Sequence, residues 1–264
     1  MEYNIFDEDG AKINYEIDGE GDPLIFLHAG GLDCRMWDLQ FRKFANHFKV
    51  IRYNFRGTGH SSHPRKPFSH HKDLHEFIDF LGIENPILIG ASLGGKVAID
   101  FALSYPKEVK ALILESPGLG GLDFSQQYIQ TIVPIIGALK TNELHSKDFA
   151  FFKNSFLALS TEDDAIIHKI TDMLQENAQF LTINPGIIQG LEPPANQQLS
   201  KIKIPVLLIQ GEKDHRDLFE IAEIIKNKLP LSQQKIIADT GHLPNLENPT
   251  RFNQVLNKFL LENQ

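Results

Sequence analysis

A serine among glycines is the first candidate for chemistry in this sequence. The stretch PILIGASLGGKVAIDFA, residues 86–102, contains the pattern G-x-S-x-G with Ser92 at its centre. An apolar, strand-like run precedes the pattern and a helix-like run follows it. A sharp turn from strand to helix exposes a serine oxygen, and small residues on either side let neighbouring backbones approach. The context therefore predicts that Ser92 is a nucleophile.

A serine hydroxyl is a weak nucleophile, so it needs a base, and the base needs an orienting group. Eleven histidines compete for the role of base. His242, in DTGHLPNLENP, lies between Gly241 and Pro244 on a short loop directly after the last predicted strand. A parallel sheet presents its chemistry on loops at the carboxyl ends of its strands. This position makes His242 the predicted base.

The acid should follow the preceding strand, where IPVLLIQGEKDHRD offers three carboxylates. The turn at Gly211 places a residue a few positions later beside the end of the sheet, which favours Asp214. Glu212 is the nearer alternative, and Asp217 could instead cap the following helix. Glu115, at the end of KALILE, could supply the acid from the neighbouring strand.

Two backbone N–H groups are predicted to hold the negative charge that develops on the substrate oxygen. Leu93 follows the nucleophile and begins a helix, so its N–H points outward. Gly30, in HAGG, offers a bare backbone after an earlier apolar run. This chemistry requires neither a metal nor a cofactor.

The elements that must position these groups alternate along the chain. Continuous apolar runs suit strands that are buried on both faces of a parallel sheet, and helix-like segments separate them. The opening YNIF and AKINYEI form a hairpin with a turn at Asp9-Gly10. The pattern predicts an α/β fold with a mostly parallel eight-stranded sheet. The remaining strand candidates are PLIFL, KVIRYNF, PILIGA, KALILES, IPVLLIQG and QKIIAD.

The alternation stops between about residues 118 and 200, where no strand is predicted. Three helix-like segments occupy this stretch, the last of them opened by Thr161 with acidic residues in its first turn. We expect residues 119–200 to form a helical cap at one end of the sheet. Residues 1–118 and 201–264 would then form the core.

The sequence resembles the α/β-hydrolase family over essentially its whole length. The matching pieces are LHAGG, NFRGTGHSS, GASLGG, IPVLLIQGEKD and DTGHLPNLENP, in that order. By this resemblance Ser92 is the nucleophile, Asp214 the acid and His242 the base, and the N–H groups of Gly30 and Leu93 form the oxyanion hole. The resemblance also implies that the helical insertion covers the site and shapes the substrate pocket.

The resemblance implies a serine hydrolase that cleaves a carboxylic ester, or a related acyl bond, of a small molecule through an acyl-enzyme. A serine nucleophile argues against the haloalkane dehalogenase and epoxide hydrolase branches. A carbon–carbon bond hydrolase or lyase with the same triad and a non-enzymatic small-ligand receptor remain as alternatives. Two residues depart from the family pattern: Ala29 replaces a more usual glycine, and Asn54 a common aspartate.

The composition of the chain indicates which kinds of partner and which cellular compartment to expect. The 264 residues carry a formal net charge of −8, and an acidic surface disfavours nucleic acid. No apolar run approaches the length of a membrane helix, and the N-terminus does not resemble a secretory signal. The single cysteine, Cys34, suits a reducing compartment. We expect a cytoplasmic protein that acts on a small molecule.

Other residues could suggest further sites. The histidines of GHSSHPRKPFSHH have a spacing that fits no helix face, and no cysteine or acidic cluster accompanies them, so we expect a solvated loop and no metal. We expect Cys34 to be a small buried thiol. We expect most of the phenylalanines between residues 149 and 156 to pack in the core of the cap. These histidines are His60, His63, His70 and His71.

Overall fold

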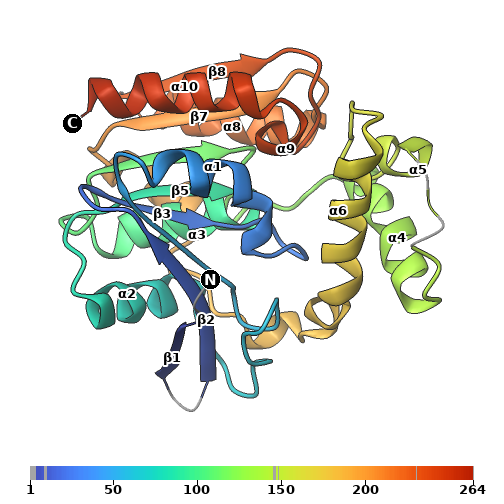
Figure 1. Ribbon diagram of the computed structural model, residues 1–264, viewed down its shortest axis with the longest axis horizontal. Helices are drawn as coiled ribbons and strands as arrows, with labels where there is room; N and C mark the ends of the chain where they lie inside the picture. Colours follow the sequence, from blue (N-terminus) through green and yellow to red (C-terminus); the bar gives the residue numbers. More distant parts are fainter. Residues whose placement is uncertain (1–3, 9–10, 145–146, 148, 230, 264) are drawn as a thin grey trace.

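The computed structural model describes residues 4–8, 11–144, 147, 149–229 and 231–263. Its centre is one eight-stranded sheet in the order β1-β2-β4-β3-β5-β6-β7-β8, which confirms the predicted fold class (Figure 1). The strands are β1 (Asn4–Glu8), β2 (Ala11–Asp18), β3 (Pro23–Leu27), β4 (Lys49–Tyr53), β5 (Ile87–Ala91), β6 (Ala111–Glu115), β7 (Val206–Gly211) and β8 (Ser232–Ile237).

In the order of the sheet, the strands from β4 to β8 are parallel neighbours, and β2 is the one described strand that runs in the opposite direction. Strand β1 pairs antiparallel with β2, and β2 pairs antiparallel with β4. The predicted hairpin is therefore present, although its turn at Asp9-Gly10 lies outside the described residues. Because β5 to β8 are parallel neighbours, their carboxyl ends share one edge of the sheet.

Both faces of the sheet are covered, which explains the continuous apolar runs of its strands. Leu24 and Phe26 of β3 pack toward α1 and α10, whereas the alternating Ile25 and Leu27 pack toward α2, α3 and α8. The helices of this part are α1 (Asp38–Phe44), α2 (His70–Leu81), α3 (Leu93–Ser104), α8 (Arg216–Lys228), α9 (Pro244–Glu247) and α10 (Pro249–Glu262), with the 3-10 helix η1 (Cys34–Trp37) before α1.

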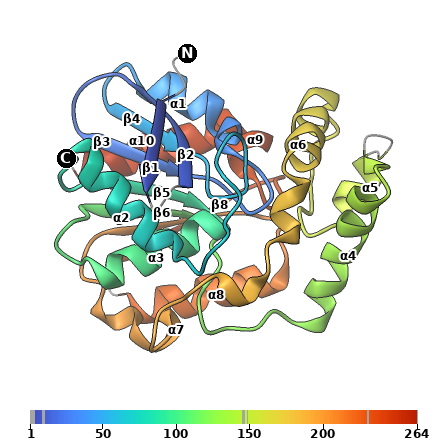
Figure 2. The ribbon, with the colours of Figure 1, turned by 90° about the horizontal axis from the view of Figure 1, so that it is seen from below.

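Between β6 and β7, the described residues form helices joined by loops, and none of them belongs to a strand of the sheet. Helices α4 to α6 stand together beyond one end of the sheet in both views (Figures 1 and 2). Helix α7 instead packs against the core, because Ala195 and Leu199 are buried with residues of α3 and the sheet. The elements of this segment are α4 (Gln126–Lys140), α5 (Phe149–Lys153), α6 (Asp164–Glu176), η3 (Ala178–Thr182), η4 (Pro185–Ile187), α7 (Ala195–Gln198) and η5 (Leu199–Lys201).

The start of α6 corrects one prediction. The N-cap is Asp163, whose side chain accepts a hydrogen bond from the N–H of Ala165, and not Thr161. The Thr161 hydroxyl accepts from the N–H of Asp163 and so stabilises the turn before the helix.

The division into a core and a cap at residues 119–200 stays a prediction. Within the described residues, every helix is too short or too polar to cross a bilayer.

Candidate active site

Ser92 occupies the turn between β5 and α3. Its backbone has φ +50° and ψ −107°, a conformation that costs a non-glycine residue about 1–3 kcal/mol. Hydrogen bonds hold the turn on both sides. The Ser92 N–H donates to the carbonyl of Glu115 at 2.9 Å, and the Ser92 carbonyl accepts from the N–H of Gly118 at 3.0 Å. The turn therefore presents the serine side chain in one fixed direction.

The glycines of the motif are required by close backbone approach. A Cβ atom on Gly90 would overlap the backbone of Gly94, and one on Gly94 would overlap the carbonyl of Leu27 in β3. Helix α3 can begin directly against the sheet only because both side chains are absent. The G-x-S-x-G pattern thus has a structural cause that the strand–turn–helix context predicted.

Asp214 and His242 form a buried hydrogen-bonded pair. Asp214 follows β7 and His242 follows β8, and the side chains are 0% and 1% exposed. The Nδ1–H of His242 donates to Asp214 Oδ1 at 3.1 Å. The other nitrogen, Nε2, is inaccessible and has no hydrogen-bond partner among the described residues. The pair therefore orients the imidazole so that Nε2, the nitrogen that a catalytic base uses, is not engaged by another residue.

Glu115 connects the serine turn to the histidine loop. Its carbonyl accepts from Ser92, and its carboxyl Oε1 accepts from the N–H of Asn245 at 2.8 Å. Asn245 lies three residues after His242, at the start of α9. One residue of β6 thus touches both segments, although no hydrogen bond joins the Ser92 hydroxyl to His242 in this structure. Catalytic hydrogen bonds are often long before substrate binds.

The two residues predicted to form the oxyanion hole, Gly30 and Leu93, are in contact. A Cβ atom on Gly30 would lie 3.6 Å from Cβ of Leu93, so the loop after β3 contacts the first residue of α3. Neither N–H has a hydrogen-bond acceptor among the residues that the structure describes. Backbone N–H groups without an acceptor, such as that of Leu93 at the start of α3, can stabilise a negatively charged oxygen.

His28 fixes the loop that carries Gly30, a role that the sequence did not reveal. Its ring is fully buried. Nδ1–H donates to the carbonyl of Ala29 at 2.8 Å, and Nε2 accepts from the N–H of Phe55 at 2.9 Å. Burial lowers the pKa of His28 to about 4, so the ring stays neutral and keeps this pattern of donor and acceptor near pH 7.

Glu247 is a second residue that sequence reasoning missed. Its Oε1 accepts from the N–H groups of Gly241 and Leu243, which flank His242, and its Oε2 accepts from the N–H of Ser160. Burial raises the pKa of Glu247 above its ordinary value. One carboxyl group therefore joins the histidine loop to the helical segment between β6 and β7. Only the three-dimensional contact with Ser160 identifies this role.

The alternative acids have other roles in the structure. Glu212 is exposed and accepts from the N–H of Asp239. Asp217 does not cap its own helix, as the sequence suggested, because its carboxylate binds the N–H and hydroxyl of Ser125 before α4. Glu115 binds Asn245 and makes no hydrogen bond to His242. Of the four carboxylates, Asp214 is the one that binds the imidazole.

Apolar side chains from the inserted segment lie over the site. The ring of Phe180 lies close to Gly30: a Cβ atom built on this glycine would be 3.6 Å from Phe180 Cε1. The ring of Phe156 lies edge-on to the ring of His242, and the two ring centroids are 6.3 Å apart. Phe152, by contrast, is fully buried in the packed interior. The phenylalanines of this segment thus divide between core packing and contact with the site.

The prediction of a solvated histidine loop is only partly right. His60 and His63 are exposed, whereas His70 and His71 begin α2 and are buried. His70 packs between the rings of Phe55 and Phe68, at centroid distances of 4.8 and 4.9 Å. Its burial lowers its pKa to about 3. The helix begins two residues earlier than its apolar pattern indicates.

Comparisons with known proteins agree with this architecture. The family model described as "Alpha/beta hydrolase family" matches residues 24–255. A putative 2-succinyl-6-hydroxy-2,4-cyclohexadiene-1-carboxylate synthase of Bacillus subtilis is 28% identical over 97% of this chain and 97% of its own length. The carboxylesterase YbfK of the same organism is 26% identical over 90% of this chain and 79% of its own.

A solved structure of a thermophilic esterase from Thermogutta terrifontis is also similar. It is 25% identical, with a TM-score of 0.79, and the match covers 98% of this chain and 97% of the esterase. The family model spans most of the chain and includes every residue of the predicted triad. The chain belongs to the alpha/beta hydrolase family, and its relatives support the conclusion that it is a hydrolase.

Proposed function

We propose that this hydrolase cleaves a carboxylic ester of a small molecule through an acyl-enzyme on Ser92. The buried pair of Asp214 and His242 carries the proposal, because its geometry leaves Nε2 of the imidazole unpartnered. An imidazole held in this tautomer by a carboxylate is suited to remove a proton from a serine hydroxyl. Ser92 supplies that hydroxyl from the strained turn after β5.

The proposed reaction uses each group in turn. His242 Nε2 takes the Ser92 proton as Oγ attacks the ester carbonyl, and Asp214 stabilises the imidazolium that forms. The N–H groups of Gly30 and Leu93 bind the oxyanion. The imidazolium then protonates the leaving alcohol. Water, activated by the same imidazole, releases the acid and restores Ser92. No cofactor enters this sequence.

The apolar contacts at the site favour an apolar acyl group. Phe156 lies beside the imidazole and Phe180 beside Gly30. Such side chains exclude water and bind hydrocarbon by burial. The carboxylesterase from Bacillus subtilis and the esterase from Thermogutta terrifontis support an ester as the bond that is cleaved. We therefore propose that short aliphatic esters are substrates, bound between the sheet edge and the inserted helices.

A second candidate is cleavage of a carbon–carbon bond, or a lyase reaction, by the same three residues. The Bacillus subtilis synthase, which is 28% identical over nearly the whole chain, favours it. A panel of p-nitrophenyl acetate, p-nitrophenyl butyrate, a lactone and a diketone separates the two candidates. The ester hypothesis expects the highest kcat/KM on p-nitrophenyl butyrate.

Substitution of the nucleophile tests the proposal. Ser92→Ala should lower kcat on p-nitrophenyl butyrate by about 10⁴-fold or more, because no attacking oxygen remains. A fluorophosphonate probe should label the native protein and not this variant. Ser104→Ala, an exposed serine at the far end of the same helix, is the matched control and should keep full activity. Ser92→Ala with native turnover would disprove the assignment.

A further inference from the structure

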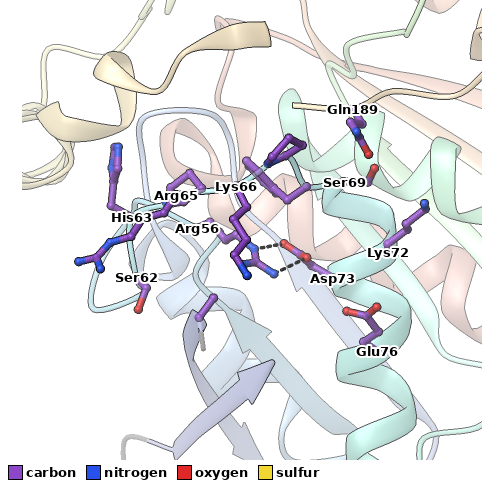
Figure 3. Close-up of a pocket in the computed structure, with 14 residues that line it drawn as sticks. Arg56, Ser62, His63, Arg65, Lys66, Ser69, Lys72, Asp73, Glu76 and Gln189 are labelled. Atoms are coloured by element: carbon purple, nitrogen blue, oxygen red, sulfur yellow. Dashed lines mark hydrogen bonds and ion pairs between the residues drawn. The ribbon is translucent and has the colours of Figure 1, made fainter. Parts of the chain in front are cut away.

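A cleft outside the candidate active site lies at the N-terminus of α2. Its volume is about 590 Å³, which is within the range of sites for small organic molecules. The loop of residues 62–67 forms one wall and the start of α2 the other (Figure 3). Gln189 closes one end, because Phe68 pairs with residues 187–189 through two backbone hydrogen bonds.

The lining of this cleft is basic, although the protein is acidic. Four cationic side chains and two carboxylates line it, whereas the whole chain carries a formal net charge of −8. Arg56 is neutralised by a bidentate ion pair with Asp73, at 2.6 and 2.8 Å. Lys66 and Lys72 form no ion pair with any carboxylate that the structure describes. In Figure 3 these two lysines come from opposite walls.

Ser69 provides a second, independent indication of a ligand. It occupies the N-cap position of α2, yet its hydroxyl does not cap the helix. The residue is only 3% exposed, its side chain lines the cleft, and the hydroxyl has no hydrogen-bond partner within the described residues. Figure 3 shows its oxygen directed toward the side chain of Gln189. The oxygen itself is not fully buried, so it is accessible from the cleft and available to a bound molecule.

The helix itself adds donors at the same place. α2 contains twelve residues, and the N–H groups of its first two residues, His70 and His71, have no intrahelical acceptor. The positive end of the helix dipole therefore lies beside the free hydroxyl of Ser69 and the ammonium group of Lys72. Backbone N–H groups, a hydroxyl and an ammonium group together are the donors that bind phosphate at helix N-termini.

We propose that this cleft binds a small phosphate monoester, with its phosphate at the N-terminus of α2 between Ser69 and Lys72. Lys66 belongs to the facing wall, and its ammonium group is directed toward Arg56 and away from Ser69 and Lys72 (Figure 3), so Lys72 supplies the charge at the phosphate position. The volume beyond the phosphate accommodates the organic part. None of the residues that line the cleft belongs to the candidate active site, so the proposal stands independently of the ester hydrolase assignment.

Calorimetric titration with two matched ligands tests the proposal on the full chain. Phenyl phosphate and benzoate share a ring and differ in the anionic group. At equal ionic strength we expect saturable binding of phenyl phosphate, at least about tenfold tighter than binding of benzoate, because the dianion carries more charge opposite Lys72 and accepts from more of the donors at the start of α2. Benzoate binding of equal strength would overturn the choice of phosphate.

Variants locate the site. Lys72→Gln and Ser69→Ala should each weaken phenyl phosphate binding, the lysine variant by about tenfold. Lys226→Gln removes an exposed lysine of α8 that does not line the cleft, and should leave the affinity unchanged. Equal affinities for Lys72→Gln and Lys226→Gln, or no saturation below about 10 mM in the native protein, would overturn the proposal. Melting temperatures of the variants would establish that each is folded.

Discussion

The strained backbone of Ser92 persists because neighbouring groups determine it from several sides. Its N–H and carbonyl are both used in hydrogen bonds to Glu115 and Gly118, and glycines at positions 90 and 94 remove the side chains that would push α3 away from the sheet. A relaxed serine would lose the N–H contact to β6. These contacts offset the conformational energy of the strained backbone and fix the direction of the Ser92 side chain.

The carboxylate of Asp214 should matter through its charge as well as its shape. Asp214→Asn keeps the size of the side chain but removes the charge that stabilises the imidazolium, and its amide can favour the wrong tautomer of His242. We expect kcat on p-nitrophenyl butyrate to fall by about 10⁴-fold, with folding intact. The exposed Glu212, two residues earlier, gives the control Glu212→Gln, which should keep native kcat. An Asp214→Asn variant with a tenth of native activity would contradict the assignment.

Glu115 provides a prediction about stability and pH. Complete burial raises the pKa of this carboxyl well above its ordinary value. The folded protein then holds a proton that the unfolded chain releases near pH 4.3. Stability therefore falls as pH rises from the unfolded pKa toward the folded one.

Glu115→Gln removes this dependence while it keeps an acceptor for the N–H of Asn245. Urea unfolding at pH 5 and pH 8 should show a smaller loss of unfolding free energy for the variant than for the native protein. Glu84→Gln, at an exposed site, should behave as native. An identical loss in Glu115→Gln and the native protein would show that Glu115 is ionised in the fold.

The candidate catalytic residues could be proposed from the sequence because each has a local signature, whereas the residues that hold them in place could not. Ser92 lies in a glycine pattern, and His242 lies on a loop after the last strand. Asp214 could be favoured over Glu212 and Glu115 but not separated from them without distances. His28 and Glu247 act through hydrogen bonds to residues that are distant in sequence, such as Phe55 and Ser160. No spacing along the chain encodes those contacts.

At the scale of elements, α9 and the loop before it behave as one unit held by Glu247. The carboxyl group binds the N–H on each side of His242 and the N–H of Ser160. The His242 N–H also donates to the carbonyl of Leu157 at 3.0 Å. The position of the imidazole therefore depends on the segment of residues 157–160 as well as on β8.

Loss of the Glu247 contacts should lower kcat more than it changes KM. Glu247→Ala leaves three N–H groups without their acceptor, so we expect kcat to fall by about tenfold or more as His242 loses its orientation. Hydrogen exchange at the amides of Gly241 and Ser160 should become faster. Glu262→Gln, near the end of α10, is the control. Unchanged kcat with faster exchange would limit Glu247 to a structural role.

Several helices and strands could be located from the pattern of apolar residues alone. Continuous apolar runs located the parallel strands, and Gly82 ends α2 in a left-handed conformation with φ +60°, as its position after an apolar pattern predicted. The start of α2 was misplaced because His70 and His71 look polar, although Phe55 and Phe68 bury His70. Contacts with aromatic rings from other segments bury a histidine that the local sequence would leave exposed, and such tertiary contacts are not visible in the sequence pattern.

Across the whole molecule, the inserted segment is joined to the core on both sides of the predicted site. Ser160 binds Glu247 on the side of the imidazole. On the side of the oxyanion loop, Asn177 donates to Asp33 at 2.8 Å and accepts from the N–H of Gly59 at 2.6 Å. The two contacts lie at opposite ends of α6. For the function proposed above, in which substrate binds between the sheet edge and the inserted helices, we expect access to depend on both contacts.

Asn177→Ala tests the second contact. Asn177 is 1% exposed, and its loss leaves the N–H of Gly59 without its acceptor and removes a hydrogen bond to Asp33, whose carboxylate keeps Arg35. We expect the unfolding free energy to fall by about 1–3 kcal/mol. KM should rise more than kcat falls, because the contact orders the segment that covers the site and leaves His242 in place. Asn46→Ala, an exposed asparagine with only a local hydrogen bond to Lys43, is the control for both measurements. A native KM in a destabilised Asn177→Ala variant would show that the inserted segment does not gate the substrate through this end of α6.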